Sequence, residues 1–226
     1  MRATGDGGDV LWDSSNQGEA RRYLDLLVDH ADRNLAVVDI GCGNGRFTRA
    51  LATRFPRALG VDLSPHAIAR AREEAGDMAN VEFRVVDMLG PDAAGLPSPC
   101  NVFVRGVLHV LDPPTRRALA STIGELLGTR GTALIAETNY DGPLLGYLES
   151  LGAGPRGLPR PLARAISAGL PRPSRFGDAE LDDCFPPVLW ERVFVDGSSR
   201  ITTVPMRRPG TPDTIPAHVA ILRLRG

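Results

Sequence analysis

Three glycines at alternate positions follow a short apolar run that contains one acid, in the stretch VVDIGCGNGRFTRAL (residues 37–51). The acid is Asp39, and the glycines are Gly41, Gly43 and Gly45. Glycine permits positive φ angles and lets a ligand lie against the backbone, and the helix expected to follow offers free N–H groups and a positive dipole end. This turn is therefore a candidate ligand-binding site.

Two further acids stand where the next two predicted strands end. Asp62 closes the strand predicted over 58–64, where a carboxylate can accept hydrogen bonds from both hydroxyls of a ribose. Asp87 closes the strand predicted over 81–87, and the backbone N–H of Met88 beside it suits a ring nitrogen of adenine. Together the acids describe a ligand with adenine, a ribose and an amino acid end.

A dinucleotide site is the main alternative for a glycine turn of this kind. Such a site needs GxGxxG and places a pyrophosphate on the helix N-terminus, whereas this chain has GxGxG. Asp39, two residues before the first glycine, would repel a pyrophosphate and attract an ammonium group. The turn therefore favours a cationic amino acid ligand over a dinucleotide.

Each acid also has a structural interpretation. Asp39 can be a satisfied strand-end carboxylate, Asp62 a partner in capping the helix that starts at Pro65, and Asp87 a turn acid before Gly90. It is the combination of the three, on successive strands, that favours a ligand site.

The elements that must position these residues alternate between strand and helix. That pattern predicts a Rossmann-like, doubly wound α/β fold with a mostly parallel seven-stranded sheet, an antiparallel C-terminal edge hairpin and a helical lid insertion. The tail segments VLWERVFVDG, SRITTVP and AHVAILRL read as strands linked by hairpins. We expect a single domain over 1–226, with these parts: an N-terminal helical cap 1–34, a cofactor-binding core 35–140, a lid 141–177, and a C-terminal helix and strands 178–226.

The set VVDIGCGNG, GVDLSPHAIARA, VEFRVVDM and VFVRGVLHVLDPPTRRAL, in this order over residues 35–137, resembles the class I S-adenosylmethionine-dependent methyltransferases of the small-molecule type. The departures are Asn101, where many relatives carry an aspartate, and GTRG in place of a proline-glycine turn. The resemblance implies S-adenosylmethionine as the cofactor and S-adenosylhomocysteine as its product. It implies the following cofactor contacts: the methionine part on Asp39, Gly41, Gly43 and Gly45, the ribose and adenine on Asp62, Leu63, Asp87 and Met88, and the ammonium on the carbonyl of Arg105.

Methyl transfer needs mainly alignment of donor and acceptor, exclusion of water and, for some acceptors, a base. His109, in the loop after the fourth predicted strand, is the candidate base, because its ordinary pKa lies near working pH. A structural role for His109 stays open. Tyr140 is the second candidate catalytic residue, and Glu137 at the end of the fifth strand could orient a base.

The lid carries arginines with almost no acids between them, which suit either a pocket wall for a carboxylate, phosphate or carrier-bound substrate or a solvated basic face: Arg156, Arg160, Arg164, Arg172 and Arg175. Tyr23, in the N-terminal cap, fits either a cover over the cofactor or the core.

Composition limits the remaining classes. A net charge of −1 gives no basic field for nucleic acid, and three scattered cysteines indicate neither a disulfide framework nor a metal site. The N-terminal segment lacks a signal-peptide pattern, and no apolar run reaches membrane-spanning length, so we expect a cytoplasmic protein with no membrane partner.

We therefore expect methyl transfer to a small-molecule acceptor, in bacterial specialised metabolism. Two alternatives stay open. One is a methyltransferase-fold enzyme that catalyses a non-methylating reaction such as a cyclisation, and the other is a catalytically silent partner subunit. A homodimer or a carrier protein as partner also stays open.

Overall fold

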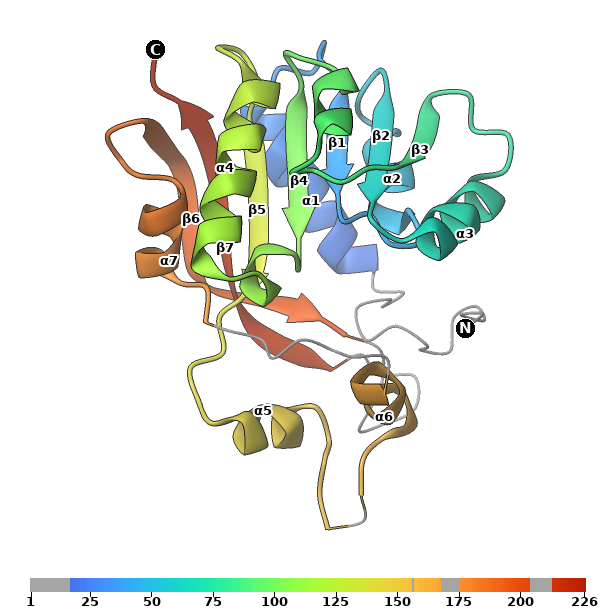
Figure 1. Ribbon diagram of the computed structural model, residues 1–226, viewed down its shortest axis with the longest axis vertical. Coiled ribbons are helices and arrows are strands. Elements are labelled where there is room, and N and C mark those ends of the chain that lie inside the picture. Colours follow the sequence, from blue (N-terminus) through green and yellow to red (C-terminus); the bar gives the residue numbers. More distant parts are fainter. Residues whose placement is uncertain (1–16, 156, 168–174, 204–212) are drawn as a thin grey trace.

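The computed structural model describes residues 17–155, 157–167, 175–203 and 213–226 of the 226-residue chain. A seven-stranded sheet in the order β3-β2-β1-β4-β5-β7-β6 crosses the molecule (Figure 1). Its strands are β1 Val37–Ile40, β2 Ala58–Asp62, β3 Val81–Val85, β4 Asn101–Arg105, β5 Ala133–Thr138, β6 Trp190–Thr202 and β7 Thr214–Leu224. The first five are parallel, and β7 and β6 are antiparallel, which confirms the predicted fold class.

Helices connect the parallel strands as the sequence predicts. They are α1 Gln17–His30, α2 Arg46–Leu51, α3 Pro65–Ala75, α4 Pro113–Leu127, α5 Leu144–Ser150, α6 Arg160–Ser167 and α7 Asp178–Cys184, with short 3₁₀ turns η1 Pro91–Gly95 and η2 Leu108–Val110. Two helix starts show why the boundaries fall there. The side chain of Ser64 accepts a hydrogen bond from the N–H of Ala67, and that of Asp112 accepts one from Thr115, each just before a proline.

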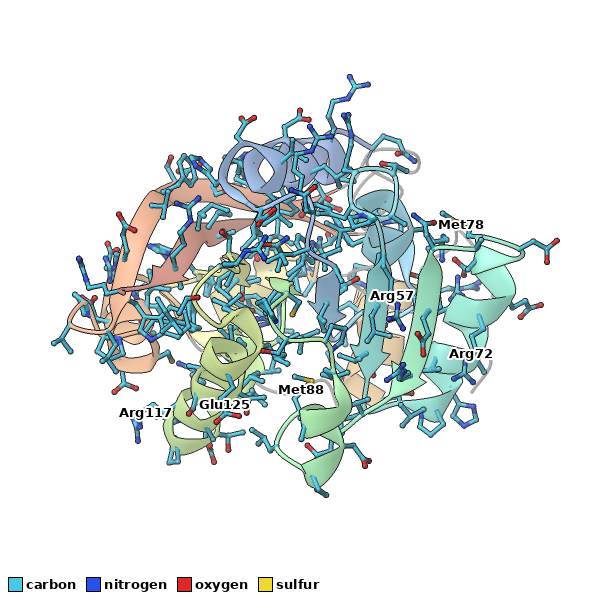
Figure 2. The ribbon with its side chains drawn as sticks, turned by 90° about the horizontal axis from the view of Figure 1, so that it is seen from above. Arg57, Arg72, Met78, Met88, Arg117 and Glu125 are labelled. Atoms are coloured by element: carbon cyan, nitrogen blue, oxygen red, sulfur yellow. The ribbon has the colours of Figure 1, made fainter. Side chains whose placement is uncertain are left out.

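Helices cover both faces of the sheet. Figure 2, seen from above, shows α1 on one side and α4, which carries Arg117 and Glu125, on the other. The side chains of α1 and α2 form one apolar cluster with alternate residues of β1, β4, β5 and β7, and those of α4 and α7 form another with the residues in between. Both layers end at the carboxyl edge of the parallel strands, where ligands bind in folds of this type.

The C-terminal strands correct one prediction. Most of VLWERVFVDG and the start of SRITTVP do not form two strands joined by a hairpin but one continuous strand, β6, over Trp190–Thr202. Register shifts between Arg192 and Phe194 and between Asp196 and Ser199 absorb the residues that look like a turn. The carboxylate of Asp196 accepts hydrogen bonds from the N–H and hydroxyl of Ser198, so the turn-type residues form a bulge within the strand.

The segment 141–177 leaves the sheet after β5. Its helices α5 and α6 lie beyond the carboxyl ends of the parallel strands (Figure 1). A small apolar cluster holds them together and reaches the sheet through Ile215 of β7; its other buried members are Tyr147, Leu151 and Leu162. The insertion thus stands where the lid is predicted, and its function as a lid stays a prediction.

None of the described helices is long and apolar enough to span a membrane. The three cysteines, Cys42, Cys100 and Cys184, are free thiols and all are buried. Among the described residues, no group of three or more His, Cys, Asp and Glu side chains could hold a metal ion.

Candidate functional site

The glycine turn after β1 adopts the left-handed conformation that its sequence predicts, with φ angles of 71° at Gly41, 56° at Gly43 and 75° at Gly45. A Cβ atom at Gly41 would lie 2.4 Å from Val107 Cγ2, so the loop after β4 packs directly on the turn. At Gly43, by contrast, an added Cβ would meet nothing within 4 Å. One end of the turn is thus closed by protein, while its middle offers open backbone for a ligand.

Asp62, at the end of β2, fixes the same turn. One carboxylate oxygen accepts a hydrogen bond from the N–H of Gly43 at 3.0 Å, and the other accepts one from the N–H of Ser64 at 2.9 Å. Each carboxylate oxygen can accept a second bond. Asp62 therefore supports both the glycine turn and the start of α3, as its structural interpretation predicts. Its two oxygens also keep acceptor positions that could bind the hydroxyls of a ribose. Leu63 beside it is 68% exposed and presents an apolar surface at the same edge.

Asp39 lies on β1 beneath the turn and is buried. Its carboxylate accepts a hydrogen bond from the Thr48 hydroxyl at 2.5 Å. Burial is the main reason why the pKa of Asp39 rises to about 7, and the nearby negative charge of Asp62 raises it further. A cation bound at this carboxylate would stabilise its charged form and so lower the pKa again. The site therefore favours the positively charged end of a ligand.

The third strand ends at Val85, two residues earlier than predicted, so Asp87 lies just beyond β3. It is exposed, and its carboxylate accepts a hydrogen bond from the N–H of Leu89 at 2.9 Å, as expected of a turn acid. Met88 is buried, whereas Leu89 is 49% exposed. The structure therefore gives Asp87 a turn function and also leaves its carboxylate accessible at the carboxyl edge.

The loop after β4 is held by one buried carboxylate. Glu137 accepts hydrogen bonds from the backbone N–H groups of Val107 at 3.0 Å, Leu108 at 2.9 Å and His109 at 3.2 Å. It also lies 2.6 Å from Nδ1 of His109. Because Glu137 accepts hydrogen bonds from three backbone N–H groups, we assign Nδ1 of His109 as a further N–H donor to this carboxylate. The predicted orienting contact between Glu137 and His109 is thus present.

A buried guanidinium holds the opposite side of that loop. Nε of Arg116 donates to the carbonyls of Leu108 at 2.8 Å and Leu111 at 2.9 Å, and Nη2 lies 3.5 Å from the carbonyl of His109. The guanidinium also lies 5.6 Å from the ring centroid of Phe176. Glu137 therefore takes the N–H groups and Arg116 the carbonyls of one short loop, which fixes the His109 ring in position.

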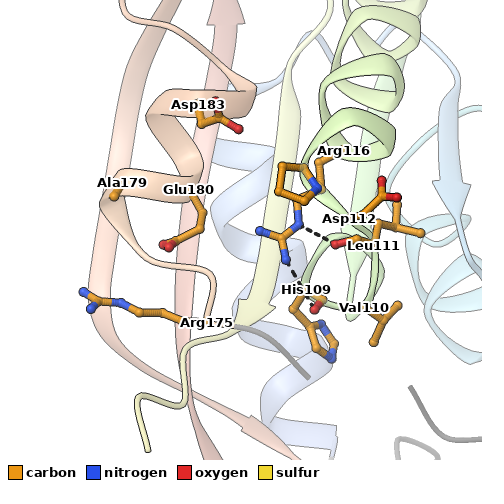
Figure 3. A pocket seen from close by; sticks show the side chains of 10 residues that line it. His109, Val110, Leu111, Asp112, Arg116, Arg175, Ala179, Glu180 and Asp183 are labelled. Atoms are coloured by element: carbon orange, nitrogen blue, oxygen red, sulfur yellow. Dashed lines mark hydrogen bonds between the residues drawn. The ribbon is translucent and has the colours of Figure 1, made fainter. Parts of the chain in front are cut away.

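A pocket of about 640 Å³ opens beside this loop, between the start of α4 and α7. Figure 3 shows Arg116 and Glu180 facing it from opposite walls, with His109 at one end. Its lining combines both signs of charge with apolar groups: His109, Val110, Leu111, Asp112, Pro113, Arg116, Arg175, Ala179, Glu180 and Asp183. The size is typical of a site for a small molecule.

The other predicted residues are distributed as follows. Tyr140 packs its ring against Tyr147 at 5.3 Å, at the base of the lid, and its contact with an acceptor stays a prediction. Tyr23 is fully buried and packs against Phe103, so of its two predicted positions the core is the one observed.

Of the five lid arginines, two are exposed, two lie outside the described residues, and the side chain of Arg164 in α6 is not among those that the structure describes. Arg160 and Arg175 are exposed, and Arg175 forms an ion pair with Asp141 at 3.0 Å and lines the pocket. Arg156 and Arg172 fall outside the described ranges. The structure thus places one of the predicted cations, Arg175, at the pocket wall.

Three residues that contact candidate site residues or their loops are not predicted from the sequence: Glu19, Thr48 and Arg116. Thr48 follows Asp39 by nine residues in the first turn of α2, and this spacing could have indicated the contact. Arg116 stands one turn after the Asp112 cap and could have been placed near the loop for that reason. Glu19 gives no local signal, because its partner Arg105 is 86 residues away.

The strand order, the glycine turn after β1 and the acids at or just after the ends of the first three strands form a Rossmann-like fold, which is similar to that of the class I S-adenosylmethionine-dependent methyltransferases. In sequence, residues 37–131 match the family model described as a methyltransferase domain. The structure is similar to that of an S-adenosylmethionine-dependent methyltransferase from Anabaena variabilis, with 27% identity, 96% of this chain and 88% of that chain covered, and a TM-score of 0.83.

The curated relatives match part of the chain. Carboxy-S-adenosyl-L-methionine synthase of Chromohalobacter salexigens is 34% identical over 133 residues, which are 53% of this chain and 46% of that protein. Trans-aconitate 2-methyltransferase of Mycobacterium ulcerans is 45% identical over 67 residues, 28% of this chain and 26% of that protein. The chain thus spans less than half the length of these relatives.

Proposed function

We propose that this protein transfers the methyl group of S-adenosylmethionine to a small-molecule acceptor. The observation that carries the proposal is the buried carboxylate of Asp39 beneath a turn whose middle, at Gly43, is open to a ligand. The family match and the Anabaena variabilis structure support the same cofactor. When bound, S-adenosylmethionine would supply an electrophilic methyl group on its sulfonium sulfur, with S-adenosylhomocysteine as the leaving group.

The cofactor fits the residues that the structure brings to the carboxyl edge. Asp39 lies where it can accept from the ammonium, and the backbone of Gly43 is open beside it. Asp62 would hold the ribose hydroxyls with the free acceptor positions of its two oxygens, and Asp87 with Met88 would hold the adenine. We assign the ammonium a second acceptor in the carbonyl of Arg105, at the end of β4.

His109 is the proposed base for an acceptor that must lose a proton. Because Nδ1 faces Glu137, Nε2 would be the nitrogen that accepts a proton from an acceptor hydroxyl or amine. Nε2 is buried in the structure, so this role requires that the pocket open toward it when the acceptor binds. The ring lies at one end of the pocket between α4 and α7, which we propose as the acceptor site (Figure 3). Its mixed lining suits a polar small molecule, and the trans-aconitate methyltransferase is one relative whose name specifies a small acceptor.

We also propose the class of acceptor, the cellular location and the metabolic setting. The chain's near-neutral charge supports a small molecule over nucleic acid, and its three free cysteines are in keeping with the reducing environment of a cytoplasm, where we place the protein. We place the reaction in bacterial specialised metabolism. A homodimer or a carrier-bound acceptor stays a prediction.

A second candidate has one specific observation in its favour. Of the curated relatives described above, the one that matches the longer segment, over 53% of this chain, is named carboxy-S-adenosyl-L-methionine synthase, and the product in that name is a carboxylated form of S-adenosylmethionine. Mass spectrometry separates the two functions. Purified protein is incubated with S-adenosylmethionine and pools of small acids, phenols and amines. Release of S-adenosylhomocysteine with a methylated acceptor supports our proposal, whereas a modified S-adenosylmethionine without homocysteine release supports the second candidate.

A further inference from the structure

A buried ion pair joins α1 to the end of β4. Nε of Arg105 donates to one carboxylate oxygen of Glu19 at 2.9 Å, and Nη2 donates to the other at 3.1 Å. The two side chains are only 6% and 4% exposed. Glu19 also accepts from the hydroxyl and the N–H of Thr202, and Nη2 of Arg105 donates to the Thr202 carbonyl at 2.9 Å. The charges are therefore paired within a network that spans α1, β4 and β6.

This network stands directly behind the cofactor edge. Arg105 is the last residue of β4, and two residues later Val107 packs on Gly41. The N–H of Gly106, between them, donates to the carbonyl of Ala136 at 2.9 Å. The ion pair thus lies at the strand end from which the backbone passes directly into one wall of the glycine turn.

The guanidinium also lies on the same face of the sheet as Asp39. Phe103, two residues before Arg105, packs in the cluster of α1 and α2, and alternate residues of a strand share a face. Arg105 lies 4.9 Å from the ring centroid of Phe47, whose neighbour Thr48 donates to Asp39. Burial raises the pKa of Asp39, and the positive charge of Arg105 acts against that rise, so the two groups interact. An unrestrained guanidinium would compete with a ligand ammonium for this carboxylate.

We propose that Glu19 is a positioning residue for the amino acid end of the cofactor. Glu19 holds the guanidinium of Arg105 in a bidentate ion pair. In doing so it keeps the end of β4 in place beside the glycine turn and prevents Arg105 from pairing with Asp39, which stays able to accept from the ammonium. The inference rests on the proposed function, because it needs S-adenosylmethionine at this edge. Glu19 touches neither the ligand nor the reacting atoms and acts through Arg105.

The test compares ligands with and without the amino acid end. Calorimetry gives the Kd values of S-adenosylhomocysteine and of 5′-methylthioadenosine for the wild type and for Glu19→Gln. Thermal unfolding of the same samples reports stability. Asp196→Asn is the matched control, because Arg22 of α1 pairs with Asp196 of β6 at 2.5 Å in a more exposed setting.

For Glu19→Gln we expect the Kd of S-adenosylhomocysteine to rise about tenfold, the effect of a lost charged contact, with the Kd of 5′-methylthioadenosine unchanged. Asp196→Asn should change neither. Equal weakening of both ligands, or of neither, overturns the inference.

A second variant tests the same contact. If Glu19→Gln does not fold, Thr202→Val, which removes only the hydroxyl that donates to Glu19, is judged by the same ratio of the two Kd values. If the wild type itself binds no S-adenosylhomocysteine, the proposed function fails. If the wild type binds it and the variant leaves the ratio of the two Kd values unchanged, the inference about Glu19 fails while the proposed function stands.

Discussion

Two regions of the molecule are held in different ways. One is the proposed cofactor edge, with Asp39, the glycine turn and Asp62, and the other is the proposed acceptor side, with His109 and the pocket beside it. At the cofactor edge, the contacts join residues 2 to 19 positions apart in sequence: Asp62 accepts from the N–H of Gly43 and of Ser64, and Asp39 accepts from Thr48. On the acceptor side, Glu137 reaches a loop 28 to 30 residues away in sequence. The comparison shows why the cofactor is readable from motifs while the acceptor is not, since the second site depends on how distant segments meet.

The largest effect is expected on the acceptor side. Glu137→Gln places an amide among three N–H donors and the His109 ring, and its NH₂ group cannot accept from them. We expect a loss of about 3 kcal/mol in the free energy of unfolding, because a buried ionic network loses its charge. Chemical denaturation measures it, with the exposed Glu125→Gln as control. A loss below about 0.5 kcal/mol, the size of a surface substitution, would show that the loop does not depend on this carboxylate.

At the cofactor edge, Asp62→Ala removes the predicted ribose acceptors and the partner of the Gly43 N–H. We expect the Kd of S-adenosylhomocysteine to rise about ten- to a hundredfold, which corresponds to about 1 to 3 kcal/mol. Calorimetry is the measurement, and Asp92→Ala, in the exposed η1 turn, is the control. An unchanged affinity would remove Asp62 from the cofactor site.

The acid under the turn predicts a pH dependence. With its pKa raised to about 7, Asp39 in the free protein gains a proton as the pH falls through that value, and a bound ammonium favours the charged form. Binding then requires loss of that proton, so affinity should fall by up to tenfold per pH unit below about 7 and level off above it. Calorimetry between about pH 6 and about pH 8 measures the slope.

Asp39→Asn is the control for that slope, because it retains an acceptor for Thr48 but does not titrate, and any slope that remains belongs to the ligand's own amine. The same slope in wild type and variant would contradict an ammonium contact at Asp39.

The smallest effect is expected in the lid. Arg175→Ala breaks an exposed ion pair with Asp141, and exposed pairs contribute about 0 to 1 kcal/mol to stability. The Kd of the cofactor should not change, whereas the KM of an anionic acceptor should rise because the cation lines the pocket. Steady-state kinetics with the acceptor found by mass spectrometry tests this split. A weaker cofactor Kd would mean that the two sides are not separate.

Local pattern explains how far the sequence predicts the structure. Alternating strands and helices, caps such as Ser64 and the glycine turn act over a few residues, and they give the sheet, the helices and the positions of Asp39 and Asp62. The turn-like residues after Asp196 mislead, because a bulge absorbs them inside β6. The pairing of Glu19 with Arg105 requires three elements to meet, and no local pattern encodes that.

The central claim, that the glycine turn and its acids bind S-adenosylmethionine, is tested most directly by calorimetry on the purified wild type with S-adenosylmethionine, S-adenosylhomocysteine and NADH. The account predicts micromolar binding of the two sulfur ligands and no binding of NADH, as expected for GxGxG preceded by an acid. Binding of NADH without either sulfur ligand would contradict it.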